Sequence, residues 1–551
     1  MKKQLTILGF SVLALFLVPL IGAEERNIQR IDVMYTSDIH GHIGRSDATF
    51  LNPNFPPPVG NGASAAAYIA KVREEAAKTD RPVFLFDSGD IFQGTPVGMH
   101  TMGASVVDWM NNVGYSAMAV GNHEFDRGWK NLRNLSNQAN FPMLGANVFN
   151  TDTQRKVDWL GDYVIFERAG FKFGVVGYVT ETTANMAFGD NVENIEFKAV
   201  HELLPGHVKE LREDNGCDFV FVLMHIGLPW EPEKEKRYLE MIEREKEGSI
   251  VRFGMNAMEL AHTVWGVDAI FAGHTHTGYL KPWQDPKTHT MVFEPYANGS
   301  SIGHVTFLID RDTKQMIGYE THFGRGALLT LFEEEIWPDE VFAKEINEEV
   351  ARVEEALGLG DTVGETTVNL VRGSAENALM GFVVVDAYRE ECNADFAIQN
   401  VGGVRANLSP GKITKRDLLA VSPFDNEMFV LEMTGHYLKE LLETKLMGRG
   451  SGIYFSGGKV RFDLARPNGD RIVSFTRDGE PVDLDATYRV AMTNYLADGN
   501  SGLIQLKEFP RDKIEVVGML DRAVLENYIQ RKGVISPTND GRWVRVKGTS
   551  E

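Results

Sequence analysis

The chain has 551 residues, of which 43% are hydrophobic and 24% charged, so about two to four domains with cores of their own are expected. This balance excludes a disordered or fibrous protein and a minimal peptide module. The formal net charge of −21 argues against binding to nucleic acid polymers or to an anionic membrane, but a small phosphorylated ligand held by a metal or by focused arginines remains compatible with it.

The N-terminus, residues 1–23, has the features of a secretory signal peptide. A basic start precedes an apolar stretch from Leu5 to Ile21, and Ala23 is the small residue at the expected cut. An uncleaved anchor is the alternative, because the stretch approaches the length of a membrane span. We expect cleavage after Ala23, and therefore a periplasmic or secreted protein without a lasting membrane anchor.

Short apolar runs then alternate with helix-like segments, at residues 31–35, 83–86, 117–120, 173–176, 219–223 and 268–271. Near-continuous apolar strands separated by helices indicate α/β layering, with sheets covered on both faces. We expect a first domain over residues 28–330, a linker helix within 331–360 and a smaller α/β domain over 361–547. Cys217 and Cys392 fall in different domains, so each is expected to be a buried small hydrophobe and not half of a disulfide.

Almost every apolar run of the first half is followed by side chains that bind metals: Asp38 and His40, Asp90, Asn122, His225, and His274 and His276. Ligand-binding groups collect beyond the carboxyl ends of strands in α/β sheets. Oxygen and imidazole donors together suit Mn²⁺, Zn²⁺, Fe or Co. The set is large enough for two ions, which a shared carboxylate can hold about 3.5–4 Å apart.

These motifs, in this order, resemble the calcineurin-like metallophosphoesterase superfamily. The resemblance implies a four-layer β-sandwich flanked by helices. It also implies that one ion is held by Asp38, His40, Asp90 and His276, and the other by Asp90, Asn122, His225 and His274. Asp87 lies in the same loop as Asp90, but the Gly-Asp pair of the motif selects Asp90 as the bridge.

The resemblance further implies that His123 stabilises the phosphoryl oxygens in the transition state, and that Asp126 orients and charges this imidazole. The other histidines, among them His42, His100, His262 and His304, are expected to be ordinary surface or core residues.

Four segments of the second half, residues 395–405, 411–414, 422–426 and 493–499, resemble the C-terminal substrate-binding domain of the 5′-nucleotidase family. By this resemblance Phe424 and Tyr495 stack on the base. The other implied substrate-binding residues are Gly402, Gly403, Arg405, Asn426, Asn494, Arg372 (a partial match) and Ser501, which stands where the family has an aspartate for the ribose.

The sequence therefore predicts an exported phosphohydrolase with two divalent ions that releases inorganic phosphate from nucleoside 5′-phosphates by attack of a hydroxide bridging the ions. A 2′,3′-cyclic nucleotide phosphodiesterase or UDP-sugar hydrolase is the first alternative, because residues 255–260 resemble a segment of cyclic phosphodiesterase relatives. A carrier that binds nucleotides without turnover is the second. The oligomeric state is not predicted.

Overall fold

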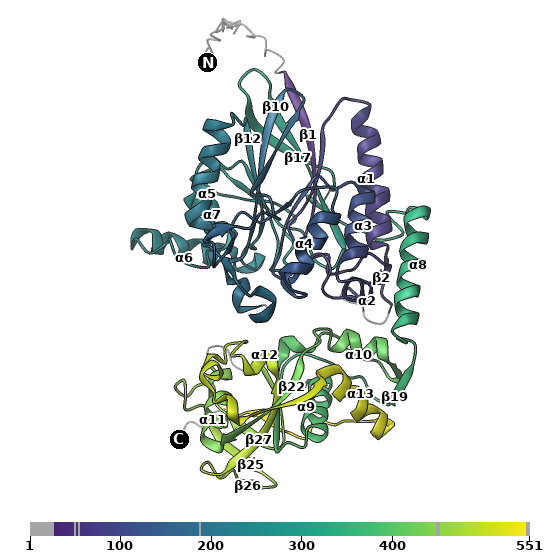
Figure 1. Ribbon diagram of the computed structural model, residues 1–551, viewed down its shortest axis with the longest axis vertical. Helices are drawn as coiled ribbons and strands as arrows, with labels where there is room; N and C mark the ends of the chain where they lie inside the picture. Colours follow the sequence, from purple (N-terminus) through teal and green to yellow (C-terminus); the bar gives the residue numbers. More distant parts are fainter. Residues whose placement is uncertain are drawn as a thin grey trace, which may run out of the picture.

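A computed structural model describes residues 27–48, 51–52, 55–186, 189–324, 326–447 and 452–546. The expected signal peptide, residues 1–23, lies outside these described residues. The chain forms two bodies, drawn one above the other in Figure 1, and helix α8 (Glu340–Ala356) runs along one side of the upper body toward the lower one.

Two sheets form the centre of the first body. The first has the order β17 (Gln315–Thr321), β16 (Ser301–Asp310), β1 (Ile28–Thr36), β4 (Val83–Asp87), β5 (Ala117–Ala119), β6 (Met143–Leu144), with β18 (Leu328–Thr330) also paired to β16. The second has the order β14 (Trp283–Gln284), β15 (Met291–Phe293), β13 (Ala269–Ala272), β12 (Phe219–His225), β10 (Phe171–Val179), β9 (Tyr163–Arg168). Strands β1, β4, β5 and β6 are parallel, as are β10, β12, β13 and β15, so each sheet gathers several carboxyl ends at one edge.

The two sheets pack face to face through a layer rich in aromatic rings. Phe84 of β4 contacts Phe173 of β10 at 5.2 Å between ring centroids, and Tyr35 of β1 contacts Phe271 of β13 at the same separation. Aromatic rings bury large apolar areas and prefer such tilted or edge contacts. The layer therefore holds the strand ends of the two sheets at fixed positions.

Helices cover both outer faces of the sandwich. The first sheet packs against α1 (Asn61–Ala77), α3 (Ala104–Val113) and α4 (Trp129–Gln138), and the second against α5 (Val200–Lys209), α6 (Lys234–Lys246) and α7 (Ala257–Thr263). Small sheets add β2 (Ser46–Asp47) with β3 (Pro58–Val59), and β11 (Ile195–Phe197) with β7 (Val148–Asn150) and β8 (Arg155–Lys156). This α/β/β/α arrangement confirms the predicted four-layer fold.

Helix α8, within the segment expected as a linker, is part of the wall of the first body. Its N-terminus is capped by Asp339, whose carboxylate accepts from the backbone N–H of Val341 and Phe342. Its buried side chains Ile346 and Val353 join the core beneath α1, and the helix also contacts α2 (Pro96–His100).

The second body is a smaller α/β unit around the sheet β23 (Ile453–Ser456), β20 (Phe396–Asn400), β27 (Thr487–Thr493), β22 (Glu427–Thr434), β28 (Ile514–Leu520). Two further sheets are β26 (Glu480–Pro481), β25 (Ile472–Arg477), β24 (Lys459–Phe462), β30 (Trp543–Arg545), and β21 (Gly411–Thr414), β19 (Thr362–Thr366), β29 (Val534–Ile535). The helices are α9 (Leu379–Glu391), α10 (Lys415–Val421), α11 (Gly435–Lys445), α12 (Asn494–Ala497) and α13 (Asp521–Lys532). One continuous hydrophobic core joins these elements.

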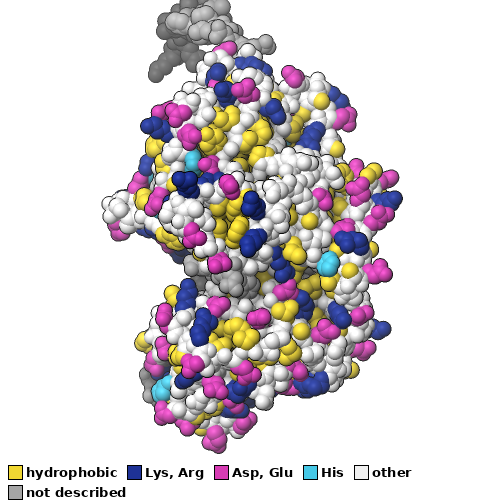
Figure 2. Space-filling view, viewed as in Figure 1, with side chains coloured by type: hydrophobic (Ala, Val, Ile, Leu, Met, Phe, Trp, Pro, Cys, Tyr) yellow, Lys and Arg dark blue, Asp and Glu magenta, His cyan; other side chains and the backbone are white. Residues whose placement is uncertain are grey.

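The structure also bears on the state of the cysteines, on membrane-spanning helices and on the distribution of surface charge. Cys217 and Cys392 are both buried and free, which confirms that they form no disulfide. Across the described ranges, no helix combines the length and apolar character that a membrane crossing needs. Acidic and basic side chains are interspersed on the face seen in Figure 2.

Candidate metal centre and active site

The predicted metal ligands come together because they follow parallel strands of both sheets. Asp38 follows β1, Asp90 follows β4 and Asn122 follows β5, whereas His225 ends β12 and His274 follows β13. Since the sandwich holds these carboxyl ends at one edge, the side chains project into the same space.

Five of these ligands adopt a backbone conformation that is uncommon for residues other than glycine. The φ angles are 53° at Asp38, 50° at His40, 59° at Asp90, 78° at His274 and 58° at His276. Such left-handed residues cost about 1–3 kcal/mol each and cluster at functional sites, where the surrounding fold maintains them. The reversed turns explain how residues two apart in sequence can aim at one point.

The first cluster contains Asp38, His40 and His276. The Nε2 atoms of His40 and His276 lie 3.0 Å apart, and Asp38 Oδ1 lies 3.3 Å from His276 Nε2 and 3.8 Å from His40 Nε2. Burial lowers the pKa of His40 to about 3, so its ring is neutral, which is the form that binds metals.

The second cluster contains Asp90, His225 and His274. His225 Nε2 lies 2.8 Å from Asp90 Oδ2 and 3.9 Å from Asp38 Oδ1, which joins the two clusters. Burial lowers the pKa of His225, but the charge of Asp90 outweighs it and raises the pKa to about 9. A divalent ion binding here would displace the proton held between these two side chains.

Asp90, and not its neighbour Asp87, lies in the cluster. Asp87 accepts a hydrogen bond from the Thr36 hydroxyl at 2.6 Å and another from the Gly89 N–H at 2.8 Å. Its burial raises the pKa of the carboxyl well above the usual value. Asp87 is therefore a structural side chain of the same loop.

The donors fit divalent metal ions in two further respects. Asn122 Oδ1 is buried and has no hydrogen-bond partner among the described residues, as expected of an oxygen that binds a cation. The Nδ1 atoms of His40 and His225 contact the carbonyl oxygens of Gln93 at 2.6 Å and Ser88 at 2.7 Å. Such contacts orient imidazole ligands and leave Nε2 for the metal.

Glu124 organises the centre, although no role was predicted for it from the sequence. Its buried carboxylate accepts from the backbone N–H groups of Asp90, Ile91 and Gly121 at 2.6–2.8 Å, and so ties the β4 loop to the β5 loop. Burial and the negative charge of Asp90 raise the pKa of Glu124 to about 7. Its position inside the Gly-Asn-His-Glu motif was the signal that could have identified it.

His123 and Asp126 form the expected pair beside the metal clusters. His123 Nδ1 lies 2.6 Å from Asp126 Oδ2, and its ring meets that of His40 edge-on at 5.5 Å between centroids. Burial lowers the pKa of His123, but the charges of Asp126 and Asp90 outweigh it and raise the pKa to about 10. The ring is therefore a cation whose Nε2 is free of the Asp126 contact.

In the second body, the structure brings two of the predicted arginines and one predicted ring together. The guanidinium of Arg405 lies 5.7 Å from the centre of the Phe424 ring. Arg372 donates to the Arg405 carbonyl at 2.8 Å. Burial, and to a lesser extent the positive charge of Arg372, lower the pKa of Arg405. Tyr495 is half-buried against the core of this body.

Several other predicted substrate residues are engaged within the second body itself. Asn426 is buried and donates to Asp521 at 3.0 Å, whereas Asn494 accepts from the Glu427 N–H at 3.0 Å. A Cβ on Gly403 would meet the side chain of Gln399 at 2.2 Å, so packing already requires glycine there; on Gly402 it would lie 3.4 Å from Asn400. Ser501 has a φ of 55°, and its carbonyl accepts from Lys445.

The loop that carries Phe424 contacts the first body next to the metal clusters. Asp425 forms ion pairs with Arg127 of the first body at 2.7 Å and with Arg522 of the second at 2.5 Å. Arg127 directly follows Asp126. Gln93, whose backbone carbonyl holds His40, also places its side-chain amide 3.5 Å from the Pro423 carbonyl.

Comparison with known proteins agrees with this geometry. The calcineurin-like phosphoesterase model matches residues 31–278, and the 5′-nucleotidase C-terminal domain model matches residues 362–508. The chain belongs to the 5′-nucleotidase family. The two matches cover the bodies that carry the metal clusters and the aromatic loop, respectively.

Relatives of this family align with nearly the whole chain. A 5′-nucleotidase of Vibrio vulnificus is 26% identical, with 97% of this chain and 97% of that protein covered. Protein UshA of Escherichia coli is 26% identical over 94% of this chain and 95% of its own length. A crystal structure of a 5′-nucleotidase precursor from Thermus thermophilus superposes with a TM-score of 0.76 at 25% identity, covering 94% of this chain and 99% of that one.

Proposed function

We propose that this protein is a metal-dependent phosphohydrolase that releases inorganic phosphate from nucleoside 5′-phosphates. The observation that carries the proposal is the position of the two joined Asp/His clusters, beside the His123–Asp126 pair and next to the loop that holds Phe424. Metal ligands and a fixed cation suit phosphoryl transfer, and an aromatic ring suits binding of a base.

We assign one divalent ion to Asp38, His40, Asp90 and His276, and a second to Asp90, Asn122, His225 and His274. Mn, Zn, Fe and Co all suit this mixture of oxygen and nitrogen donors. When bound, such ions polarise phosphoryl oxygens and make water a strong nucleophile at neutral pH. The protein holds their ligands in place through Glu124, Gln93 and Ser88.

His123 acts on the substrate itself. Its Nδ1 is occupied by Asp126, so Nε2 is the ring atom left to donate to a phosphoryl oxygen. A fixed cation at this point stabilises negative charge as it develops on the phosphoryl group, and Asp126 prevents the ring from turning away.

The second body supplies the nucleoside site in this proposal. Phe424 and Tyr495 stack on the base, and Arg405 and Arg372 add positive charge beside Phe424. Ser501 offers a neutral hydroxyl for the ribose where the family has a carboxylate. Asn426 and Asn494 shape the loops around the base, because their side chains already bond within this body.

The segment that favoured a cyclic phosphodiesterase, residues 255–260, is part of the core. Met255, Met258 and Leu260 are buried beneath the second sheet, and Asn256 caps helix α7 through a capping box with Glu259. Core packing and the helix cap account for these residues, so their presence does not by itself favour a cyclic substrate.

The location outside the cytoplasm also belongs to this proposal. It rests on the basic and apolar sequence of residues 1–23. N-terminal sequencing of the protein exported by its native cell tests it: we expect a new terminus at Glu24, and a protein that keeps Met1 would contradict cleavage.

Product analysis on the metal-reconstituted protein tests the enzymatic proposal. AMP, 2′,3′-cyclic AMP and UDP-glucose are offered separately, and nucleoside, nucleotide and phosphate are quantified. We expect AMP to give adenosine and phosphate with the highest kcat/KM. Faster turnover of either other substrate would support the corresponding alternative, and tight binding of AMP without turnover would support a carrier.

A further inference from the structure

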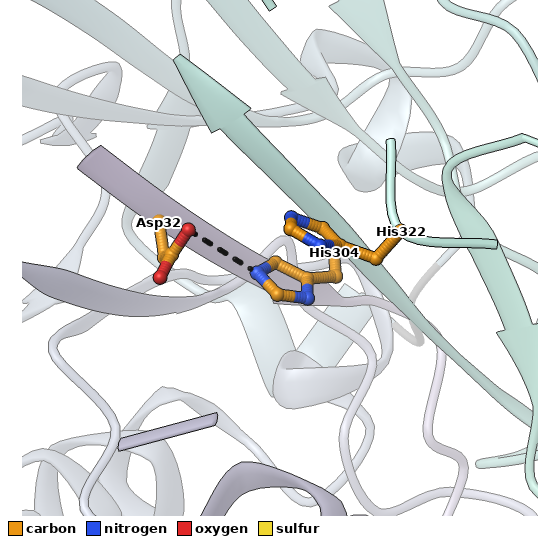
Figure 3. Close-up of side chains that lie close together, drawn as sticks. All are labelled: Asp32, His304 and His322. Carbon is orange, nitrogen blue, oxygen red and sulfur yellow. Dashed lines mark ion pairs between the residues drawn. The ribbon is translucent and has the colours of Figure 1, made fainter. Parts of the chain in front are cut away.

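A third group of metal-binding side chains lies away from the strand ends, on the outer face of the first sheet. Asp32 on β1 pairs in register with Thr306 on β16, and His304 is two residues from Thr306 on the same face. His322 follows the end of β17, the next strand of the sheet. Figure 3 shows the two imidazole rings side by side, with His304 directed toward Asp32.

The distances in this group are close to those of a metal site. One carboxylate oxygen and one nitrogen of each ring all lie within 4.8 Å of one another, and His304 Nε2 lies 3.6 Å from Asp32 Oδ1. Donors around a tetrahedral zinc ion, with bonds of about 2.0–2.1 Å, are about 3.3 Å apart. Reorientation of the side chains, chiefly of the His322 ring, would bring the three donors to one ion.

Two buried polar atoms in this group lack a hydrogen-bond partner within the described part of the chain: His304 Nε2 and Asp32 Oδ2. His304 is 3% exposed and Asp32 is 0% exposed, so bulk solvent hardly reaches either side chain. Leaving a buried polar group unsatisfied costs about 1–3 kcal/mol, and more when it is charged. A cation bound between these two side chains would give His304 Nε2 a partner and would add to the ion pair that Asp32 Oδ2 makes with Arg81 at 3.5 Å.

The surrounding contacts resemble those that support imidazole ligands. The Tyr68 hydroxyl, from α1, lies 2.8 Å from His304 Nδ1, which leaves Nε2 for an ion. Arg81 lies 3.5 Å from Asp32 Oδ2, and the Thr306 hydroxyl donates to Asp32 Oδ1, so both carboxylate oxygens are held in place. Burial and the neighbouring His304 lower the pKa of His322, which favours the neutral ring.

An ion could reach this group from the surface. His322 is exposed and lines an open cavity of about 630 Å³ together with Thr321 and Phe323. Its ring stacks on His304 at 3.8 Å between centroids, with an angle of 13° between the planes, and its Nε2 contacts the Thr306 hydroxyl at 2.6 Å. To bind an ion, the His322 ring turns out of this stack and exchanges the hydroxyl for the metal.

We propose that Asp32, His304 and His322 bind one further divalent transition-metal ion, separate from the catalytic centre. Two imidazoles and one carboxylate suit Zn²⁺, with water as the fourth ligand. Because the ion would join β1, β16 and the end of β17, its role is to fasten the outer strands of the first sheet. The proposal is independent of the proposed function, since none of its residues belongs to the catalytic clusters.

Zinc counting in the full-length protein tests the proposal. Wild type, His322→Ala and the control His436→Ala, which removes an exposed histidine from the second body, are equilibrated with Zn²⁺, freed of unbound metal and analysed by mass spectrometry. We expect His322→Ala to hold one zinc fewer per chain than the other two proteins. Because only the difference is used, the zinc content of the catalytic clusters cancels.

A second variant and a direct observation complete the test. Tyr68→Phe, which keeps the ring but loses the contact to His304, is expected to weaken this one zinc about 10- to 100-fold in competition with a chromophoric chelator. Anomalous diffraction at the zinc edge should show a peak between the three side chains. Equal zinc content in wild type and His322→Ala, or no peak in zinc-soaked crystals, would show that the group is only a hydrogen-bonded network. Hydrolysis of p-nitrophenyl phosphate should be unchanged in His322→Ala.

Discussion

The metal centre of the first body and the aromatic site of the second are built in different ways. In the first, ligands from two sheets converge to 2.8–3.9 Å, and backbone groups hold them through Glu124, Gln93 and Ser88. In the second, Phe424 lies on a loop and Tyr495 lies in the short helix α12. Asn426 and Asn494 bond within this body, whereas Asp425 also pairs with Arg127 of the first body. Under the proposed function, the sandwich therefore fixes the catalytic groups, whereas substrate selection depends on loops of the second body.

The largest expected effect comes from Asp90, the carboxylate that the proposed assignment places on both ions. Asp90→Asn should lower the affinity of the protein for both ions and lower kcat by about 10³-fold or more. Removing a single group that stabilises charge in the transition state already lowers kcat by about 10²–10³-fold. Metal analysis and AMP hydrolysis measure the two effects. Asp87→Asn is the matched control: this buried carboxyl of the same loop lies outside both clusters, so both ions should remain. An Asp90→Asn protein with two ions at wild-type affinity would remove Asp90 as the bridge.

The second effect separates the fixed cation from the ligands. His123→Asn should retain both metals and lose about 10²-fold in kcat, since it removes one stabiliser of the transition state. Asp126→Asn should cause a smaller loss, because the imidazole stays but loses the charge that holds its proton. If metal content falls in parallel with rate, His123 is a ligand and the proposed division of roles is wrong.

The third effect concerns the two aromatic rings of the second body, and it tests whether this body acts on the base and not on the phosphate. The double change Phe424→Ala with Tyr495→Ala removes two stacking contacts worth about 1–3 kcal/mol each, so kcat/KM for AMP should fall about 30-fold or more. p-Nitrophenyl phosphate, which has no base to stack, should be cleaved nearly as before. Equal loss with both substrates would show that these rings are needed for folding and not for the base.

The smallest effect concerns the ribose. Ser501→Asp should raise kcat/KM for AMP about fivefold, because a carboxylate makes stronger hydrogen bonds to hydroxyls than a neutral group does. Aspartate tolerates the left-handed backbone found at this position, and Ser501→Asn is the neutral control of similar size. No gain for AMP in the presence of a fully active metal centre would indicate that the ribose does not reach residue 501.

The sequence was informative where function follows local structure. Each predicted metal ligand stands just after an apolar run, so strand prediction alone placed Asp38, Asp90 and His274 beyond the carboxyl ends of strands. The four-layer fold followed from the resemblance that these motifs carry. The left-handed backbone at these residues is consistent with their position in turns, but this conformation was not predicted from the sequence.

Contacts that depend on strand register or on the meeting of the two bodies could not be predicted. Asp32 and Thr306 are 274 residues apart, and only the pairing of β1 with β16 places them opposite each other. His304 therefore looked like an ordinary histidine. The ion pair of Arg127 with Asp425 spans 298 residues and exists because the second body docks beside the metal clusters.

The most direct test of the central claim is phosphate release from AMP by metal-stripped protein, with and without restored metal. The protein is treated with a chelator, the chelator is removed, and Mn²⁺ or Co²⁺ is added back. We expect no turnover after stripping and recovery when the ions return, with adenosine and phosphate formed in equal amounts. Full activity in the stripped protein, or intact metal loading with AMP bound and never cleaved, would contradict it.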